Sequence, residues 1–370
     1  MVDNYRVSDV HIFEGEVFMR AATLSASEKS QKNIGRAVDR SIDKKVYNRH
    51  IPRLGNYINE SYINIDIENL RQIDNDDVKR ASFIGNNTKF LDKNLLNIFF
   101  IKLIIRSNEQ IKESDLEYLN QMLMWEMNDI YVMPTLEFDD SVGRPDRVRI
   151  YSDFVARMLE MKDRLVPGKL NVGLSVPLYF SKKQIGELFS LYRNEPVAPT
   201  FVSIDYGNTR VSDPKQMGKV LTTIKQFREN NEEKYFMYAL NARPYKRGET
   251  HPIAEDLGLA KTGFNGFGGP HYPPAPRYVP PATEWSQLGK IFENYDHRYY
   301  PLSEEGPRNE FLTWAENDYS IDELKPPREI AGVVRPIVKR YNFCKVNEEL
   351  KEISDAVRKS DDDYLNNKPR

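Results

Sequence analysis

Acidic side chains stand where apolar segments of this chain end. Glu137 and Asp139 follow the apolar segment 130–136, and Asp205 ends another. Carboxylates that converge from different strands suit general acid/base or nucleophile/acid chemistry, in which one is ionised and the other protonated. We therefore identify Asp205, Glu137 and Asp139 as candidate catalytic residues. The alternative is that each acid caps the following turn or helix, as Asp139 and Asp140 would before Ser-Val-Gly.

Polar and basic residues follow two other apolar segments. Asn241 and Arg243 come directly after 235–240, and Arg106 comes after 98–105. Because a guanidinium binds a carboxylate or phosphate in a bidentate manner, we expect these three residues to bind substrate. The alternative is a solvated basic loop.

A glycine-rich segment spans residues 263–269. Bare backbone N–H groups can approach an anion closely there, and barrel enzymes often bind phosphate in loops after their late strands. The sequence therefore predicts an anion-binding loop of Asn265, Gly266, Gly268 and Gly269, with the strand before it ending at about Phe264. No Gly-Lys-Ser/Thr follows, so the segment is not a Walker A loop. A tight turn is the alternative.

Residues typical of metal, cofactor and serine-nucleophile sites are missing from the sequence. The five histidines show no helical metal-binding spacing, and the single cysteine, Cys344, excludes a Cys-based zinc cluster. No Gly-x-Ser-x-Gly elbow occurs. We therefore expect no metal and no cofactor.

Strand-like and helix-like segments alternate through the middle of the chain. Helix signals between the apolar runs include the Ser114/Glu117 capping-box spacing, Ser181, and Asp213 before Pro214. Such alternation predicts neighbouring parallel strands covered by helices. The five strand segments are 98–105, 130–136, 171–178, 201–204 and 235–240.

Two further strand candidates, 62–67 and 263–267, bring the strand count near that of a barrel. The predicted fold class is therefore an α/β protein with a (β/α)8 TIM-type barrel, an N-terminal extension and a proline-rich late loop. The alternative, an open doubly wound parallel sheet, is disfavoured because no Gly-x-Gly-x-x-Gly follows an early strand.

The segments outside this core have a different composition. We expect an N-terminal extension (1–60) with a basic segment at 29–53, and a barrel domain (61–342) that includes the proline-rich loop 270–281. A C-terminal helix and solvated tail follow at 343–370. Aromatic and basic residues interleave in the late loops, which together with the basic segment suits a nucleotide or nucleic acid. The alternative is that these aromatic residues pack the proline-rich loop against the barrel.

The overall composition sets broad limits on function. Lys and Arg number 53 against 55 Asp and Glu over 370 residues, which gives no global attraction to nucleic acid or an anionic membrane. The chain has no apolar signal-peptide core near its start and no apolar run long enough to span a bilayer. We therefore expect a soluble, cytoplasmic protein. The oligomeric state stays open.

One stretch resembles a known family. The segment 238–245, Gly248 to Ala260 with its His251-Pro, and Gly263-Phe-Asn265 are similar to the late barrel of tRNA-guanine transglycosylases. That resemblance implies a (β/α)8 barrel that exchanges a guanine base through an aspartate nucleophile. The nucleophile's position here is Asn265, whose amide cannot form the glycosyl-enzyme bond in the usual way, and the family's zinc cysteines are missing.

Three functional classes follow. The first is a barrel enzyme acting on a glycosidic or phosphorylated substrate, with base exchange of the transglycosylase type as one form. The second is a catalytically silent barrel that binds nucleic acid. The third is a structural subunit of a larger assembly, and a shared cavity for the candidate carboxylates would favour the first.

Overall fold

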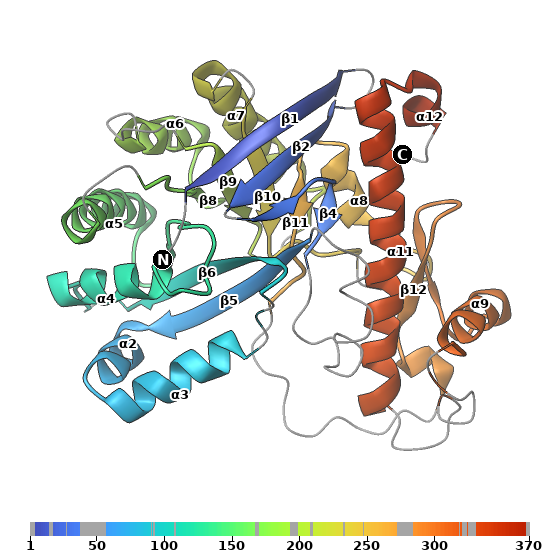
Figure 1. Ribbon diagram of the computed structural model, residues 1–370, viewed down its shortest axis with the longest axis horizontal. Helices are drawn as coiled ribbons and strands as arrows, with labels where there is room; N and C mark the ends of the chain where they lie inside the picture. Colours follow the sequence, from blue (N-terminus) through green and yellow to red (C-terminus); the bar gives the residue numbers. More distant parts are fainter. Residues whose placement is uncertain are drawn as a thin grey trace.

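The computed structural model of the chain is an α/β protein in which parallel strands alternate with helices (Figure 1). It describes residues 4–14, 18–26, 28–37, 57–89, 91, 93–106, 109–166, 170–192, 199–207, 210–231, 234–246, 248–271, 284–317, 319, 324 and 331–367. Most of the basic segment 29–53 and of the proline-rich loop 270–281 lies outside these residues.

The parallel strands form two sheets. One has five strands in the order β4-β11-β10-β9-β8, and the other has three in the order β5-β6-β7. A parallel bridge joins Val132 before β7 to Gly173 before β8. The predicted parallel pairing is therefore confirmed between β6 and β7, between β8 and β9, and between β9 and β10, whereas the runs 130–136 and 171–178 belong to different sheets and are joined by this isolated bridge. The strands are β4 (Gly35–Arg36), β5 (Ile58–Asp66), β6 (Leu96–Ile105), β7 (Thr135–Phe138), β8 (Leu174–Pro177), β9 (Phe201–Asp205), β10 (Phe236–Leu240) and β11 (Gly266–Phe267).

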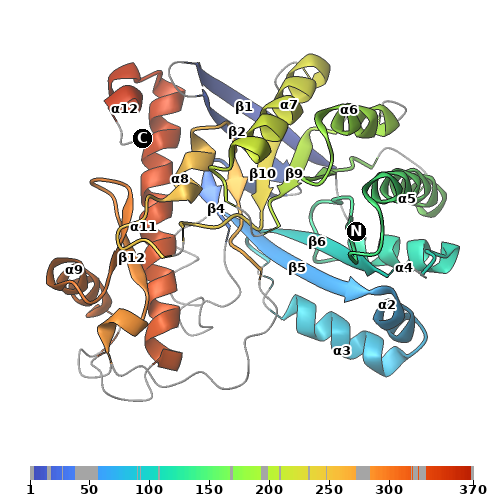
Figure 2. The same cartoon turned by 180° about the vertical axis from the view of Figure 1, so that it is seen from behind.

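Helices connect successive strands and fan around one side of the sheets in Figures 1 and 2. Ser181 caps α6 and Asp213 accepts from the first turn of α7, as the sequence predicts. The Ser114/Glu117 capping box is wrong, because α4 already begins at Glu113. The helices are α2 (Ile67–Asp74), α3 (Asp77–Thr88), α4 (Glu113–Leu123), α5 (Arg144–Leu165), α6 (Lys182–Leu191), α7 (Pro214–Asn231) and α8 (Glu255–Ala260).

Strands β5, β6, β9 and β10 each bury residues in two different hydrophobic clusters. On β6, Leu103 packs with residues of the covering helices, whereas Phe100 belongs to a cluster made of strand residues. The Phe100 ring stacks on Tyr238 of β10, with centroids 5.1 Å apart. Burial of one such side chain contributes about 1.5–3 kcal/mol. The contact joins the three-stranded sheet to the five-stranded sheet through their enclosed faces.

An N-terminal antiparallel sheet covers the amino ends of the strands. It consists of β1 (Tyr5–Glu14), β2 (Phe18–Ala26) and β3 (Lys29–Gln31). The Tyr5 hydroxyl donates to the Val172 carbonyl before β8 at 3.1 Å and accepts from the Phe201 amide at 3.2 Å. These strands were not predicted, and they leave the carboxyl ends of the parallel strands as the open edge.

The C-terminal part packs along the side opposite the fan of helices (Figure 1). Its long helix α11 (Ala331–Lys359) contacts β2 and β4 and has a hairpin of β12 and β13 beside it. The predicted solvated tail is wrong in part, because residues 362–367 form a helix with Leu365 buried. The remaining elements are η2 (Trp285–Gln287), β12 (Lys290–Glu293), β13 (Arg298–Pro301), α9 (Glu305–Ala315) and α12 (Asp362–Asn367). No helix among the described residues is long and apolar enough to cross a membrane.

Candidate active site

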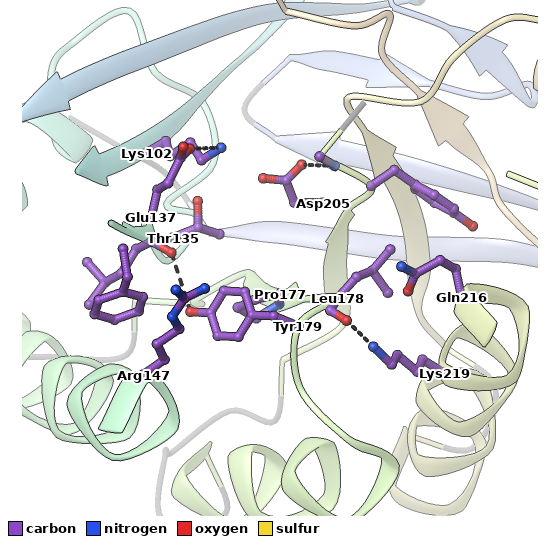
Figure 3. Close-up of a pocket in the computed structure, with 14 residues that line it drawn as sticks. Lys102, Thr135, Glu137, Arg147, Pro177, Leu178, Tyr179, Asp205, Gln216 and Lys219 are labelled. Carbon is purple, nitrogen blue, oxygen red and sulfur yellow. Dashed lines mark hydrogen bonds and ion pairs between the residues drawn. The ribbon is translucent and has the colours of Figure 1, made fainter. Parts of the chain in front are cut away.

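A pocket of about 450 Å³ opens at the carboxyl ends of β7, β8 and β9 (Figure 3). Two of the predicted catalytic residues, Glu137 and Asp205, line it. The pocket therefore brings together carboxylates that are far apart in the sequence. The other lining residues are Lys102, Thr135, Leu136, Phe138, Arg147, Pro177, Leu178, Tyr179, Tyr206, Gly207, Gln216 and Lys219.

Glu137 forms an ion pair with Lys102. In the parallel register of β6 and β7, Ile104 lies opposite Glu137 and Lys102 opposite Thr135, so both charged side chains reach the same face. The Glu137 side chain is half exposed, whereas Lys102 is largely buried. Lys102 was not predicted from the sequence, although a single lysine inside an apolar strand is itself a signal.

Asp205 is the last residue of β9 and is held by two hydrogen bonds. Its Oδ1 accepts from the Asn241 side-chain amide and from the Gly207 backbone N–H, each at 2.8 Å. These donors fix the carboxylate as a hydrogen-bond acceptor. Figure 3 shows that it points toward the Lys102–Glu137 pair across the pocket.

Asn241 adopts the left-handed conformation, with φ of 56°. For a residue with a Cβ this region costs about 1–2 kcal/mol, and such strain often accompanies a functional constraint. Here the conformation follows the last residue of β10 and turns the amide onto Asp205. The predicted binding residue Asn241 thus contacts the predicted catalytic residue Asp205.

Cationic and phenolic groups complete the pocket wall. Arg147 donates to the backbone carbonyls of Val142 at 2.7 Å and Asp139 at 3.0 Å and lies 4.0 Å from the Asp140 carboxylate, and these contacts orient its guanidinium. Burial raises the pKa of Tyr179 well above its ordinary value, which keeps the phenol protonated. Its hydroxyl donates to the Leu136 carbonyl at 3.3 Å, and Lys219 donates to the Leu178 carbonyl.

Asp139, the third predicted catalytic acid, does not line this pocket. Its Oδ1 accepts from the backbone N–H of Ser141 at 2.9 Å and from the Ser141 hydroxyl. This is the turn-capping arrangement that the sequence left as the alternative. Local hydrogen bonds with Ser141 therefore orient the Asp139 side chain, and Glu137, two residues earlier, is the acid that lines the pocket.

The two predicted binding arginines are not among the lining residues. Arg106 is exposed, and its backbone N–H donates to the Glu109 carboxylate at 2.7 Å. Arg243 is partly buried, and its Nε has no hydrogen-bond partner among the described residues. The structure therefore brings neither arginine to the Glu137–Asp205 pocket.

The glycine-rich segment differs from the prediction. The strand does not end at Phe264, because β11 is Gly266–Phe267. Asn265 is fully buried: its Nδ2 donates to the Arg20 carbonyl at 2.8 Å, and its Oδ1 accepts from Met237 N–H at 3.0 Å and from Arg20 Nη1 at 3.1 Å. Its side chain thus ties β11 to the N-terminal sheet.

The two later glycines do lie near charged groups. A Cβ on Gly268 would overlap the Glu60 carboxylate, and one on Gly269 would lie 3.6 Å from Arg36 Nη2. Gly268 therefore makes room for Glu60, a buried acid of β5 that was not predicted from the sequence. Glu60 lies within a β-rich run between neutral residues, and that pattern is its signal.

No group of three or more His, Cys, Asp or Glu side chains in the described part of the chain is arranged to hold a metal ion. The pocket is lined by carboxylate, amine, guanidinium and phenol side chains. No family model matches the sequence, and no curated protein matches it significantly.

Proposed function

We propose that the parallel strands form one (β/α)8-type barrel. The two sheets together supply eight parallel strands, and the bridge between Val132 and Gly173 runs from one sheet to the other. The stacking of Phe100 on Tyr238 supports closure, because in an eight-stranded ring β6 and β10 stand opposite each other. Barrel enzymes carry their active sites at the carboxyl ends of the strands, where this pocket lies.

On this basis we propose an enzyme that cleaves or transfers a glycosidic bond in a polar, phosphorylated substrate such as a sugar phosphate or nucleotide. The observation that carries the proposal is that Asp205 and Glu137 line one pocket. Two carboxylates flanking a reacting bond are the usual machinery for glycosyl chemistry. An intracellular substrate of this kind agrees with the predicted cytoplasmic location.

The contacts of each acid suggest its role. Asp205 accepts two hydrogen bonds, so its carboxylate faces the anomeric carbon as nucleophile or as stabiliser of the developing positive charge. Lys102 and Glu137 form an ion pair on the other wall, and we propose that this pair supplies the proton to the leaving oxygen as the glycosidic bond breaks. Arg147 and Lys219 face a substrate phosphate from the pocket wall.

Base exchange of the transglycosylase type is one form of this reaction. Asn265 is not its nucleophile in this proposal, because its side chain is fully engaged in the core. Asp205 takes that role. The nucleic-acid-binding barrel and the structural subunit remain alternatives, and no contact among the described residues favours either.

A substrate panel tests the proposal. Purified protein is incubated with nucleosides, nucleotides and nitrophenyl glycosides with and without a phosphate, and release of the free base or phenol is measured. We expect turnover that falls at least about 100-fold in Asp205→Asn and in Glu137→Gln. The matched control is Glu187→Gln, an exposed acid of α6 that pairs with Lys183. Equal rates in all four proteins would contradict the proposed carboxylate pair.

A further inference from the structure

Gln216 lines the pocket but has no role in the proposed reaction. It shares the pocket with Asp205 and Glu137, and Figure 3 shows its amide end directed into that pocket beside Leu178. Its Oε1 is buried and has no hydrogen-bond partner among the described residues. A buried acceptor without a donor is costly, because it has given up water for no other hydrogen bond. The residues around Gln216 therefore leave its acceptor unsatisfied.

The local partner that a glutamine commonly has at this position is not used. Gln216 is the third residue of α7, as Gln184 is the third residue of α6. In α6, Gln184 Oε1 accepts from the backbone N–H of Ser181 at 2.8 Å and closes a capping box. In α7, the backbone N–H of Asp213 instead donates to the Arg210 carbonyl at 3.4 Å. The Gln216 side chain therefore lines the pocket rather than capping its own helix.

The first turn of α7 holds Gln216 in place. Asp213 Oδ1 accepts from the backbone N–H of Lys215 at 2.8 Å and from that of Gln216 at 3.4 Å. Lys219 lies one turn further along the same face of the helix and donates to the Leu178 carbonyl in the pocket wall. The amide is thus presented from a regular helix, beside the ammonium group that the proposal assigns to the substrate phosphate.

The chemistry of Oε1 restricts what can bind it. An amide oxygen only accepts hydrogen bonds, so its partner must be an O–H or N–H group. A phosphate dianion, a carboxylate and a ring oxygen have no hydrogen to donate. The donors of a nucleotide are its ribose hydroxyls and the N–H groups of its base, and those of a sugar phosphate are its ring hydroxyls.

The place of Gln216 in the pocket favours the sugar over the base. Figure 3 shows Gln216 and the Lys102–Glu137 pair at opposite ends of the pocket. Asp205 lies between them in that view. In the proposed reaction the leaving group takes its proton from the Lys102–Glu137 pair, and Asp205 faces the anomeric carbon. The sugar ring then extends from Asp205 toward Gln216 and Lys219.

We infer that Gln216 is the specificity residue of the proposed reaction and that it binds a ring hydroxyl of the sugar. This inference rests on the proposed function and narrows its substrate to a ribosyl phosphate rather than a deoxyribosyl phosphate. A site built to bind a hydroxyl rejects the analogue that lacks it, because the buried polar group then stays unpaired. Gln216 therefore contributes selectivity, and no bond is made or broken at its side chain.

Binding of three sugar phosphates to the purified protein tests this without turnover. The probes are ribose 5-phosphate, 2-deoxyribose 5-phosphate and 3-deoxyribose 5-phosphate, each measured by isothermal titration calorimetry. We expect wild type to bind ribose 5-phosphate at least about 10-fold more tightly than one or both deoxy analogues. In Gln216→Met, which keeps the length and the helix propensity of the side chain, the three affinities should agree within about 2-fold.

The matched control is Gln184→Met, which removes the glutamine at the equivalent position of α6. This variant loses a capping box, so its melting temperature should fall while its preference for ribose 5-phosphate stays as in wild type. Gln216→Met removes a buried acceptor without a partner, so its melting temperature should equal or exceed that of wild type. The two melting temperatures distinguish a ligand-binding amide from a structural one.

Several outcomes would overturn the inference. They are equal wild-type affinities for the three probes, no binding of any probe, and a ribose preference that Gln216→Met retains. A loss in Gln216→Met that is confined to nucleotides, with ribose 5-phosphate bound as in wild type, would place Gln216 at the base and would also overturn it.

The proposed function can fail separately. If Asp205→Asn and Glu137→Gln keep full turnover in the substrate panel while Gln216→Met loses the ribose preference, the carboxylate pair is wrong and the hydroxyl site remains. If both acids are required for turnover but ribosyl and deoxyribosyl nucleotides react equally, the proposed function remains and Gln216 is not its specificity residue.

Discussion

The side-chain amide of Asn241 donates a 2.8 Å hydrogen bond to the carboxylate of Asp205, across the ends of two neighbouring strands. Asn241 reaches this position with a positive φ of 56°. A residue at the end of one strand thus fixes the acid at the end of the next.

Two substitutions of Asn241 separate the cost of its backbone strain from the contribution of its hydrogen bond to Asp205. Asn241→Ala keeps a Cβ in the left-handed region, whereas Asn241→Gly removes it, and both lose the amide. We expect the free energy of unfolding of Asn241→Gly to be about 1 kcal/mol higher than that of Asn241→Ala, and the activity of both variants to be equally reduced. Urea denaturation together with initial rates checks this. Equal stability of the two variants would mean that the strain is relieved elsewhere.

Gly268 and Gly186 give a matched comparison. A Cβ on Gly268 would overlap the buried Glu60 carboxylate, whereas one on Gly186 in α6 meets nothing within 4 Å. Gly268→Ala should therefore destabilise the fold by about 1–3 kcal/mol, because the carboxylate must leave its donors. Gly186→Ala should stabilise it by about 0.5–1 kcal/mol. Thermal melts of both variants test the pair, and a neutral Gly268→Ala would contradict the close packing around Glu60.

The sequence predicts the parts of the fold that depend on local pattern. The runs around Phe100, Ile204 and Tyr238 and the caps at Ser181 and Asp213 are strands and helix starts in the structure. Chain order and parallel pairing then bring the strand ends together. The pocket shared by Glu137 and Asp205 is consistent with that reasoning.

What the sequence could not predict depends on contacts between distant residues. Lys102 faces Glu137 because of the register between two strands, and Glu60 meets His271 from a position 211 residues away in the chain. The prediction of Asp139 as a catalytic residue failed for the opposite reason, because a local donor, the backbone N–H of Ser141, orients its carboxylate. The β1–β2 pair was missed since its polar and apolar residues alternate only in part, with a register shift between Ser8 and His11.

Asn265 allows the role implied by the transglycosylase resemblance to be tested. Asn265→Leu would leave the Met237 amide and the Arg20 carbonyl without their partner in the core. We expect a loss of about 2–4 kcal/mol in unfolding free energy, from two unsatisfied buried groups, but an unchanged kcat per folded molecule. Activity corrected for the folded fraction by circular dichroism measures this. A selective loss of kcat would instead give Asn265 a part in the chemistry.

Glu293 should make stability depend on pH. Burial, followed by its hydrogen bond with Glu310 and the charge of that residue, raises the pKa of Glu293 to about 8, with Lys345 opposing the shift. Because the folded protein holds this proton more tightly than the unfolded chain, the folded state binds more protons between about pH 4.5 and 8. The contribution of Glu293 to stability is therefore complete at acidic pH and is lost as pH rises toward 8.

In Glu293→Gln the side chain stays neutral. Its free energy of unfolding, measured by urea denaturation at about pH 5, 6.5 and 8, should therefore change less with pH than that of wild type. Glu316→Gln, an exposed acid beside α9, is the control and should follow wild type. Parallel curves for wild type and Glu293→Gln would mean that Glu293 is ionised in the folded protein throughout this range.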